Sequence, residues 1–210
     1  MSIWKYLFNL EERRNWWTRK MPDGPLRAYY DVPFPMRDSD WGQVDYLALD
    51  FETTGLDPET DEILSIGYTT VRGPSLLFSE AAHLLAKPSR AIPEASAVVH
   101  GILDDEASRA QPLEEVLPQL LQALAGKAML AHHAAIEYHF LSNACKRIYG
   151  YPFIGPVVDT LALEVRAFRS RDQAIKSGDL RLAAARDRYN LPRYPAHNAR
   201  WSWLGQLPPR

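Results

Sequence analysis

The pattern of apolar and polar positions divides the chain into a strand-rich first half and a helix-rich second half. Three mostly apolar segments, separated by short loops, come first: residues 45–52, 62–71 and 76–86. The connection between the second and the third contains Gly73 and Pro74, which is typical of a hairpin. Short connections favour antiparallel pairing, so these segments predict a three-stranded meander.

Helical spacing replaces this pattern after residue 112. Apolar side chains recur at helical intervals from Leu113 to Leu124, and Gly126 is the expected stop, although Pro118 lies inside the run. Short buried strands are expected at residues 127–132 and 157–158, and further helices at 134–148, 159–169 and 179–190. The order βββαβαβαα predicts an α/β domain with a mixed sheet flanked by helices.

The first 43 residues differ from the rest, since they hold four of the six tryptophans and four prolines. We expect a short amphipathic helix near residues 3–19, followed by an irregular arm. We therefore divide the chain into an N-terminal helix and arm (1–43), a main domain (44–199) and an atypical tail (200–210). The arm either packs on the domain surface or docks a partner, and the sequence leaves both open.

Composition narrows the possible classes. The chain has 210 residues, 46% of them hydrophobic and 24% charged, which suits one packed domain with an appendage. A single cysteine, Cys145, excludes an internal disulfide and a cysteine zinc cluster. The first apolar run, interrupted by Lys5 and Asn9, is too short for a signal peptide or a membrane span, so we expect a cytoplasmic protein with no membrane contact.

Charge argues against a globally basic nucleic-acid binder, because the formal net charge is −2. A local basic rim is available, however. The segment from Thr160 to Arg193 contains eight lysines and arginines but only four acids. These cations form either an ordinary solvated helix surface or a set of phosphate contacts.

Asp50-Phe51-Glu52 is the sharpest chemical signal in the sequence. Side chains alternate along a strand, so Asp50 and Glu52 project from one face while Phe51 points into the core. Two neighbouring carboxylates on a buried strand repel each other, and a divalent cation such as Mg²⁺ or Mn²⁺ would remove that cost. The alternative is a pair of solvated acids at a strand end.

The surrounding residues resemble a known family. Asp-Phe-Glu-Thr-Thr-Gly-Leu at 50–56, followed by Ile-Leu-Ser-Ile-Gly at 63–67, resembles the first motif of the DEDDh 3′→5′ exonucleases. That family includes ribonuclease T and the proofreading epsilon subunit of bacterial replicative polymerase. The segment 99–102, with His100, resembles the family's second nucleotide-contacting segment. The resemblance implies a ribonuclease H-like exonuclease fold with a five-stranded mixed sheet.

The second family motif corresponds to residues 131–141. Glu137 stands at the position of the metal-binding acid, one methylene longer than the usual Asp, and His133 stands where Asn is usual. A solvated acid on a helix surface is the alternative for Glu137. The segment 157–161 resembles a further family segment, in which we expect Asp159 to cap or brace a helix rather than bind metal.

The third family motif corresponds to residues 194–199, where His197 fits the general base. An imidazole with a pKa near neutrality can accept a proton from a metal-bound water. The family's third metal-binding Asp would fall on residue 202, which is serine. The resemblance covers about residues 45–199, and we interpret the tail as replaced, by a shifted reading frame or by truncation.

The resemblance implies a mechanism with two Mg²⁺ or Mn²⁺ ions per site. Asp50 and Glu52 hold one ion, Asp50 and Glu137 hold the other, and Glu52 and His197 act in catalysis. The implied substrate contacts are Phe51, Thr53, Thr54, Gly55, Leu56, His100, His132 and His133.

The expected partners are nucleic-acid 3′ ends, single-stranded DNA or RNA, and a polymerase subunit. We expect DNA as the substrate and nucleoside 5′-monophosphates as the products. Two alternatives remain, a weakly active or inactive accessory protein that binds nucleic-acid ends or a polymerase subunit, and an RNA-trimming exonuclease.

Overall fold

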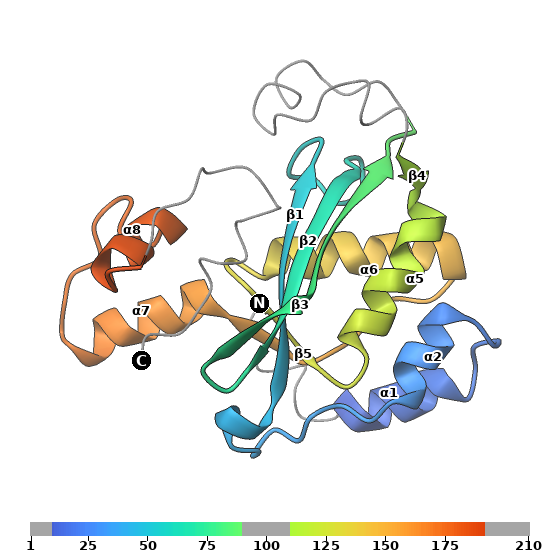
Figure 1. Cartoon of the computed structure of the whole chain (residues 1–210), viewed down its shortest axis with the longest axis horizontal. Helices are drawn as coiled ribbons and strands as arrows, with labels where there is room; N and C mark the ends of the chain where they lie inside the picture. Colours follow the sequence, from blue (N-terminus) through green and yellow to red (C-terminus); the bar gives the residue numbers. More distant parts are fainter. Residues whose placement is uncertain (1–9, 90–109, 192–210) are drawn as a thin grey trace.

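The computed structural model describes residues 10–89 and 110–191, which form one mixed sheet flanked by helices (Figure 1). The sheet has six strands in the order β4-β3-β2-β1-β5-β6. Their bounds are β1 Asp45–Thr53, β2 Ile63–Arg72, β3 Ser75–Lys87, β4 Gln111–Pro112, β5 Ala128–Ala131 and β6 Val157–Asp159.

Strand directions confirm the expected meander and its parallel extension. Strands β1, β2 and β3 pair antiparallel, whereas β5 pairs parallel with both β1 and β6. The ribonuclease H-like architecture is therefore confirmed, with six strands rather than five. The additional strand is β4, which pairs parallel with the end of β3 through Ala86 and Lys87. Two residues carry no periodicity, so no sequence pattern predicts this strand.

The helices are α1 Leu10–Thr18, α2 Pro25–Asp31, α5 Leu113–Leu124, α6 Ala135–Tyr149, α7 Thr160–Ser170 and α8 Leu182–Arg188, with a 3₁₀ turn at Trp41–Gln43. Helix α5 begins directly after Pro112 and continues through Pro118. Helix α6 ends at Gly150, which adopts a left-handed conformation, as is usual after a helix. No helix in the described part of the chain is long and apolar enough to cross a membrane.

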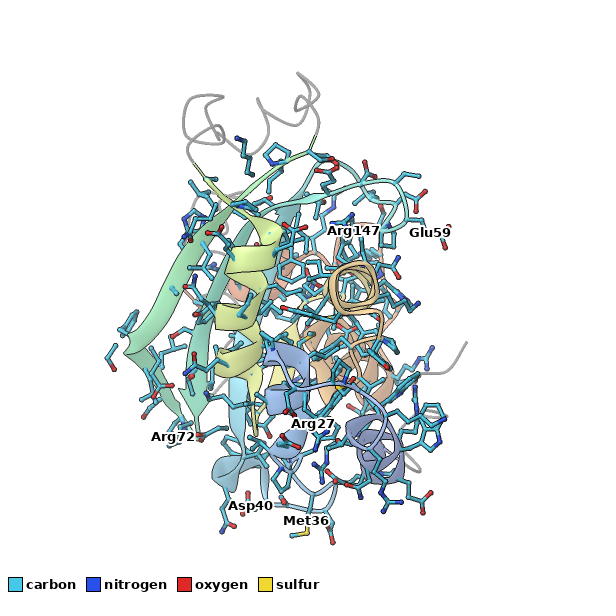
Figure 2. All side chains as sticks on the ribbon, turned by 90° about the vertical axis from the view of Figure 1, so that its right-hand side faces the viewer. Arg27, Met36, Asp40, Glu59, Arg72 and Arg147 are labelled. Atoms are coloured by element: carbon cyan, nitrogen blue, oxygen red, sulfur yellow. The ribbon has the colours of Figure 1, made fainter. Side chains whose placement is uncertain are left out.

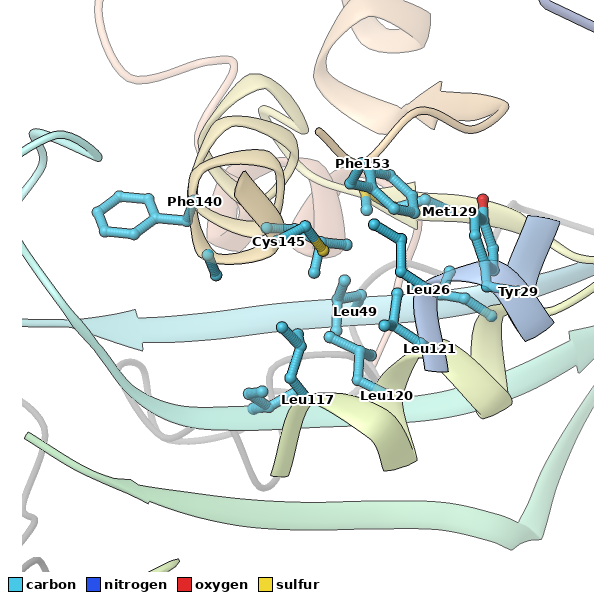
Figure 3. Packing of buried hydrophobic residues seen from close by; sticks show 14 of the residues in the cluster. Leu26, Tyr29, Leu49, Leu117, Leu120, Leu121, Met129, Phe140, Cys145 and Phe153 are labelled. Carbon is cyan, nitrogen blue, oxygen red and sulfur yellow. The ribbon is translucent and has the colours of Figure 1, made fainter. Parts of the chain in front are cut away.

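The main core lies between the sheet and helices α5 and α6 (Figure 3). Because successive side chains along β1 point to opposite faces of the sheet, Leu47, Leu49 and Phe51 all lie in this core. Cys145 of α6 is buried in the same cluster, and burial raises the pKa of its thiol. Asp50 and Glu52, being even-numbered, belong to the opposite face of the strand.

The expectation of an irregular N-terminal arm is wrong between residues 25 and 31, where helix α2 forms. Pro25 occupies the first helical turn, where its fixed φ favours the helix. Tyr29 and Tyr30 are fully buried, and their hydroxyls donate to the carbonyls of Ile154 (3.1 Å) and Pro152 (2.7 Å). This part of the arm therefore packs into the core.

The arm lies far from the carboxyl end of β1. Figure 2 shows Met36 and Asp40 of the arm at one end of the molecule, and Glu59 of the β1–β2 loop with Arg147 of α6 at the other. The N-terminal segment thus supports the core from the end opposite to the predicted catalytic acids.

Candidate metal and nucleic-acid site

Three parallel strands bring the predicted acids to one edge of the sheet. Because β1, β5 and β6 run in the same direction, their carboxyl ends meet there. Asp50 and Glu52 lie near the end of β1, Glu137 lies in the first turn of α6 just after β5, and Asp159 ends β6. Ligand sites of open α/β sheets form at this kind of edge.

The two strand acids sit in a regular part of the ladder that ends immediately after them. Asp50 pairs with Gly67 and Glu52 pairs with Ser65, and the register shifts between Glu52 and Thr53. Glu52 is only 6% exposed, whereas Asp50 is half-buried. Such an irregularity lets the chain leave the sheet directly beyond the two carboxylates.

Glu137 is a buried acid, which rules out the alternative of a solvated helix surface. Its side chain is 5% exposed, and its Oε2 has no hydrogen-bond partner among the described residues. Burial, and secondly repulsion by Asp50, raise the pKa of Glu137 to about 8. Asp50 therefore lies near enough to oppose ionisation of Glu137, although the two belong to different elements.

The carboxylates of Asp50, Glu52 and Glu137 meet some of the requirements of a divalent-cation site and lack others. Within residues 10–89 and 110–191, no three Asp, Glu, His or Cys side chains are arranged as a ready metal site. A buried carboxylate oxygen without a hydrogen bond, repelled by a second carboxylate, is nevertheless the arrangement that a hard cation stabilises.

The threonine hydroxyls of the loop after β1 form hydrogen bonds within that loop. Thr53 Oγ1 donates to the carbonyl of Gly55 (2.6 Å), and Thr54 Oγ1 donates to Asp61 Oδ1 (3.1 Å). Leu56, in contrast, is 80% exposed. Thr53 and Thr54 thus shape the predicted substrate loop, and Leu56 is the apolar side chain that this loop presents to solvent.

Phe51 contributes to the site through its backbone. Its ring is buried in the main core, so the side chain does not face a substrate. Hydrogen bonding to the backbones of Glu137 itself and of Phe51 lowers the pKa of Glu137 and offsets part of the effect of burial.

His132 and His133 have different environments. His132 is half-buried, and its ring nitrogens contact Thr160 Oγ1 (2.9 Å) and the carbonyl of Leu180 (2.8 Å). Burial lowers its pKa. His133 is exposed and has a positive φ of 67°, a conformation that Asn and His tolerate better than most residues, which explains a histidine where the family has Asn.

Asp159 has the capping role expected from the sequence. Its Oδ1 accepts hydrogen bonds from the amides of Leu161 (3.0 Å) and His133 (2.9 Å). The first bond caps α7, and the second ties the residues before α6 to the end of β6. Asp159 therefore braces the site edge.

The basic region around α7 and α8 is partly used within the protein. Arg188 forms an ion pair with Glu164, donates to the carbonyl of Asp179 (2.7 Å) and stacks on Phe168, while Arg186 is buried. These contacts favour a structural role for Arg188. His100, His197 and Ser202 lie outside the described residues.

One cavity in the described part of the chain is separate from these acids. It measures about 700 Å³ and lies between the second face of the sheet, at Tyr46 and Leu130, and helices α7 and α8, at Leu163 and Ala185. None of Asp50, Glu52 and Glu137 lines it. Its walls are mainly apolar.

Comparison with known proteins decides the family. The sequence model of the RNase T exonuclease family matches residues 47–200. The chain belongs to this exonuclease family. The match ends two residues before Ser202, close to the limit near residue 199 that the motifs indicated.

Proteins with similar sequences include two that bear the name of DNA polymerase III. The PolC-type DNA polymerase III of Thermotoga maritima is 37% identical over 140 residues, which is 67% of this chain and 10% of that protein. A DNA polymerase III epsilon-like protein of Rhodobacter capsulatus is 32% identical over 124 residues, covering 59% of this chain and 18% of the relative. The chain thus spans about a tenth of the PolC-type relatives.

Solved structures share the fold of this exonuclease. Exonuclease I of E. coli in complex with a dA16 oligonucleotide gives a TM-score of 0.69 at 16% identity, over 79% of this chain and 39% of that one. The cell-death related nuclease CRN-4 gives 0.67 at 16% identity, over 78% and 61%. At this identity the likeness concerns the fold alone.

Proposed function

We propose that this exonuclease removes nucleotides from the 3′ end of a nucleic-acid strand with the help of two divalent metal ions. The observation that carries the proposal is the buried carboxylate of Glu137, whose Oε2 has no hydrogen-bond partner in the described structure and whose ionisation Asp50 opposes. A cation at this edge of the sheet would stabilise both ionised acids.

In this proposal Asp50, Glu52 and Glu137 hold Mg²⁺ or Mn²⁺ at the carboxyl end of β1. Bound there, the ions would supply charge stabilisation for the attacking and leaving oxygens of the phosphodiester. Leu56 of the adjacent loop and His133 before α6 are both exposed, and in this proposal they contact the terminal nucleotide. His197 serves as the base that accepts a proton from the attacking water.

DNA is the substrate that we propose. Two similar relatives bear the names of DNA polymerase III proteins, and one structural neighbour was solved with a dA16 oligonucleotide. We further propose that the protein works beside a polymerase. The proposed site residues bind metal ions and the nucleic-acid backbone, and none is assigned to the 2′-hydroxyl that distinguishes RNA from DNA. RNA is therefore the comparison substrate in the test below.

The polarity of digestion is the first testable prediction. A 5′-labelled single-stranded DNA should shorten in steps of one nucleotide in the presence of Mn²⁺, and the released product should be a nucleoside 5′-monophosphate. The same assay on closed circular DNA is the control, since a circle has no end to attack. Nicking of the circle as the main activity would contradict an exonuclease mechanism, and faster loss of an RNA strand would reassign the substrate.

A second candidate function rests on Ser202. A serine where the family has its third metal-binding acid leaves a neutral oxygen in place of a charge, which favours a protein that binds 3′ ends and cuts them slowly or not at all. Binding of a 5′-labelled oligonucleotide without any shortening in millimolar Mn²⁺ would support this candidate.

A further inference from the structure

We infer that Asp61 is a positioning residue of the nucleic-acid site, because its carboxylate fills the space beside Gly55 and fixes the shape of the loop from Thr53 to Asp57. This inference goes beyond the proposed function and rests on it only for its effect on the substrate. The packing of Asp61 against Gly55 is independent of any activity.

The glycine at position 55 is required for space, not for an unusual backbone conformation. Its φ lies outside the left-handed region, unlike those of Gly73, Gly126 and Gly150. A Cβ atom built on Gly55 would instead overlap all three atoms of the Asp61 carboxyl group. Any larger residue at position 55 must therefore displace this carboxylate or move the loop.

Asp61 is held there by hydrogen bonds from two parts of the loop. Its Oδ1 accepts from Thr54 Oγ1 (3.1 Å), and its Oδ2 accepts from the amide of Asp57 (2.9 Å). One carboxylate thus joins the residue before Gly55 to the residue after Leu56. Displacing it releases both sides of the segment that carries Leu56 at its exposed tip.

The neighbouring residue, Glu62, connects the same loop to β3. Thr54 and Glu62 bond to each other twice, since the amide of Thr54 donates to the carbonyl of Glu62 and the amide of Glu62 donates to Thr54 Oγ1, both at 2.9 Å. The carboxylate of Glu62 accepts from the amide of Ser89 (2.6 Å) and from its hydroxyl. Ser89 lies just beyond the end of β3.

A third contact fixes the far side of the loop to α6. Asn143 Nδ2 donates to the carbonyl of Pro58 (3.1 Å), and α6 is the helix that carries Glu137. The loop after Asp50 and Glu52 is therefore attached to β3 and to α6. Within this attached loop, Asp61 is the residue whose carboxylate packs against Gly55 and bonds to Thr54 and Asp57.

The consequence for function follows from geometry. Leu56 and the backbone around it would contact the terminal nucleotide beside the acids at the end of β1, and loss of contacts that bind substrate and transition state equally raises KM with little change in kcat. Asp61 itself is not proposed to contact the substrate. Loss of its carboxylate should therefore weaken the apparent affinity for the strand more than it changes the rate at saturation.

The test is a double-mutant cycle with Gly55→Ala, Asp61→Ala and the combined variant in the full chain. Each single variant should lower the thermal midpoint. It should also raise the KM for a 5′-labelled oligonucleotide by about tenfold, with kcat changed much less. Because the added methyl group at position 55 finds room once the carboxylate is gone, the combined variant should resemble Asp61→Ala and not multiply the two effects. Glu59→Ala, which removes an exposed acid of the same loop, should leave KM unchanged.

Either of two results would overturn the inference. Additive changes of the thermal midpoint would show that Gly55 and Asp61 act independently, whatever the activity. The two substitutions could instead have non-additive effects on the thermal midpoint while KM is unchanged, or while kcat falls as much as KM rises. Either result would show that Asp61 only stabilises the fold. A chain that neither binds nor cuts any oligonucleotide would refute the proposed function and the positioning role, while the thermal cycle would still decide the packing of Gly55 on Asp61.

Discussion

Replacing Asp50 by Asn is expected to abolish nuclease activity, and EDTA is expected to do the same to the unmodified chain. Asp50 lies on the face of β1 opposite to the main core and opposes the ionisation of Glu137, and in the proposed function it is the acid that binds both ions. Ions that stabilise a phosphodiester transition state contribute several kcal/mol, so the rate should fall by about 1,000-fold or more. Initial rates on a 5′-labelled oligonucleotide across a Mn²⁺ titration measure this effect.

Asp45→Asn is the matched control for this substitution. Asp45 begins the same strand, but it is occupied in a surface ion pair with Arg72 (2.6 Å). Exposed pairs of this kind contribute about 0–1 kcal/mol to stability, so Asp45→Asn should leave the nuclease rate within about twofold. Activity that resists EDTA and survives Asp50→Asn would exclude the metal mechanism.

Glu137→Gln is expected to lower the rate by about a hundredfold or more, as loss of a metal ligand should, without destabilising the metal-free protein. The side chain keeps its shape and its burial, but the charge that would attract a cation is lost. Glu114→Gln is the control, because Glu114 also lies in the first turn of a helix and is exposed. A Glu137→Gln variant with unmodified activity would remove Glu137 from the site.

The stability of the same variant should depend on pH in a defined direction. Burial raises the pKa of Glu137 to about 8, above the ordinary value of 4.5. Between these two values the folded protein binds a proton that the unfolded chain has released, so its stability falls as the pH rises through this range. In EDTA, Glu137→Gln should therefore be at least as stable as the unmodified chain at pH 6, and more stable at pH 9. If Glu137→Gln lowered the thermal midpoint relative to the unmodified chain, and lowered it more at pH 9 than at pH 6, the result would contradict this prediction.

The sequence predicted those parts of the fold that depend on periodicity. Alternation through residues 45–52 placed Phe51 in the core and Asp50 with Glu52 on the other face, and helical spacing placed α5 and α6. Helix α2 was missed because its apolar residues, Leu26, Tyr29 and Tyr30, lie among prolines and span only two turns. Its formation depends on hydrogen bonds to residues 152–154, which no local pattern encodes.

The sequence motifs predicted which residues form the candidate site, but not the burial and the contacts of their side chains. The motifs selected Glu137, but only the fold shows that it is buried and faces the charge of Asp50. The motif assigned Thr53 and Thr54 to substrate contacts, yet their hydroxyls bond within the loop. Asp61 was missed because the contact that gives it a role, the space beside Gly55, joins residues six positions apart in an irregular loop.

Binding of Mn²⁺ to the protein without substrate tests directly whether carboxylates from β1 and α6 form a shared cation site. Titration of the full chain, followed by electron paramagnetic resonance of free Mn²⁺, should show saturable binding that Asp50→Asn and Glu137→Gln each weaken by at least about tenfold, a change of about 1.4 kcal/mol, and that Asp45→Asn leaves unchanged. Equal Mn²⁺ binding by all four proteins, or no saturable binding by any of them, would contradict the account.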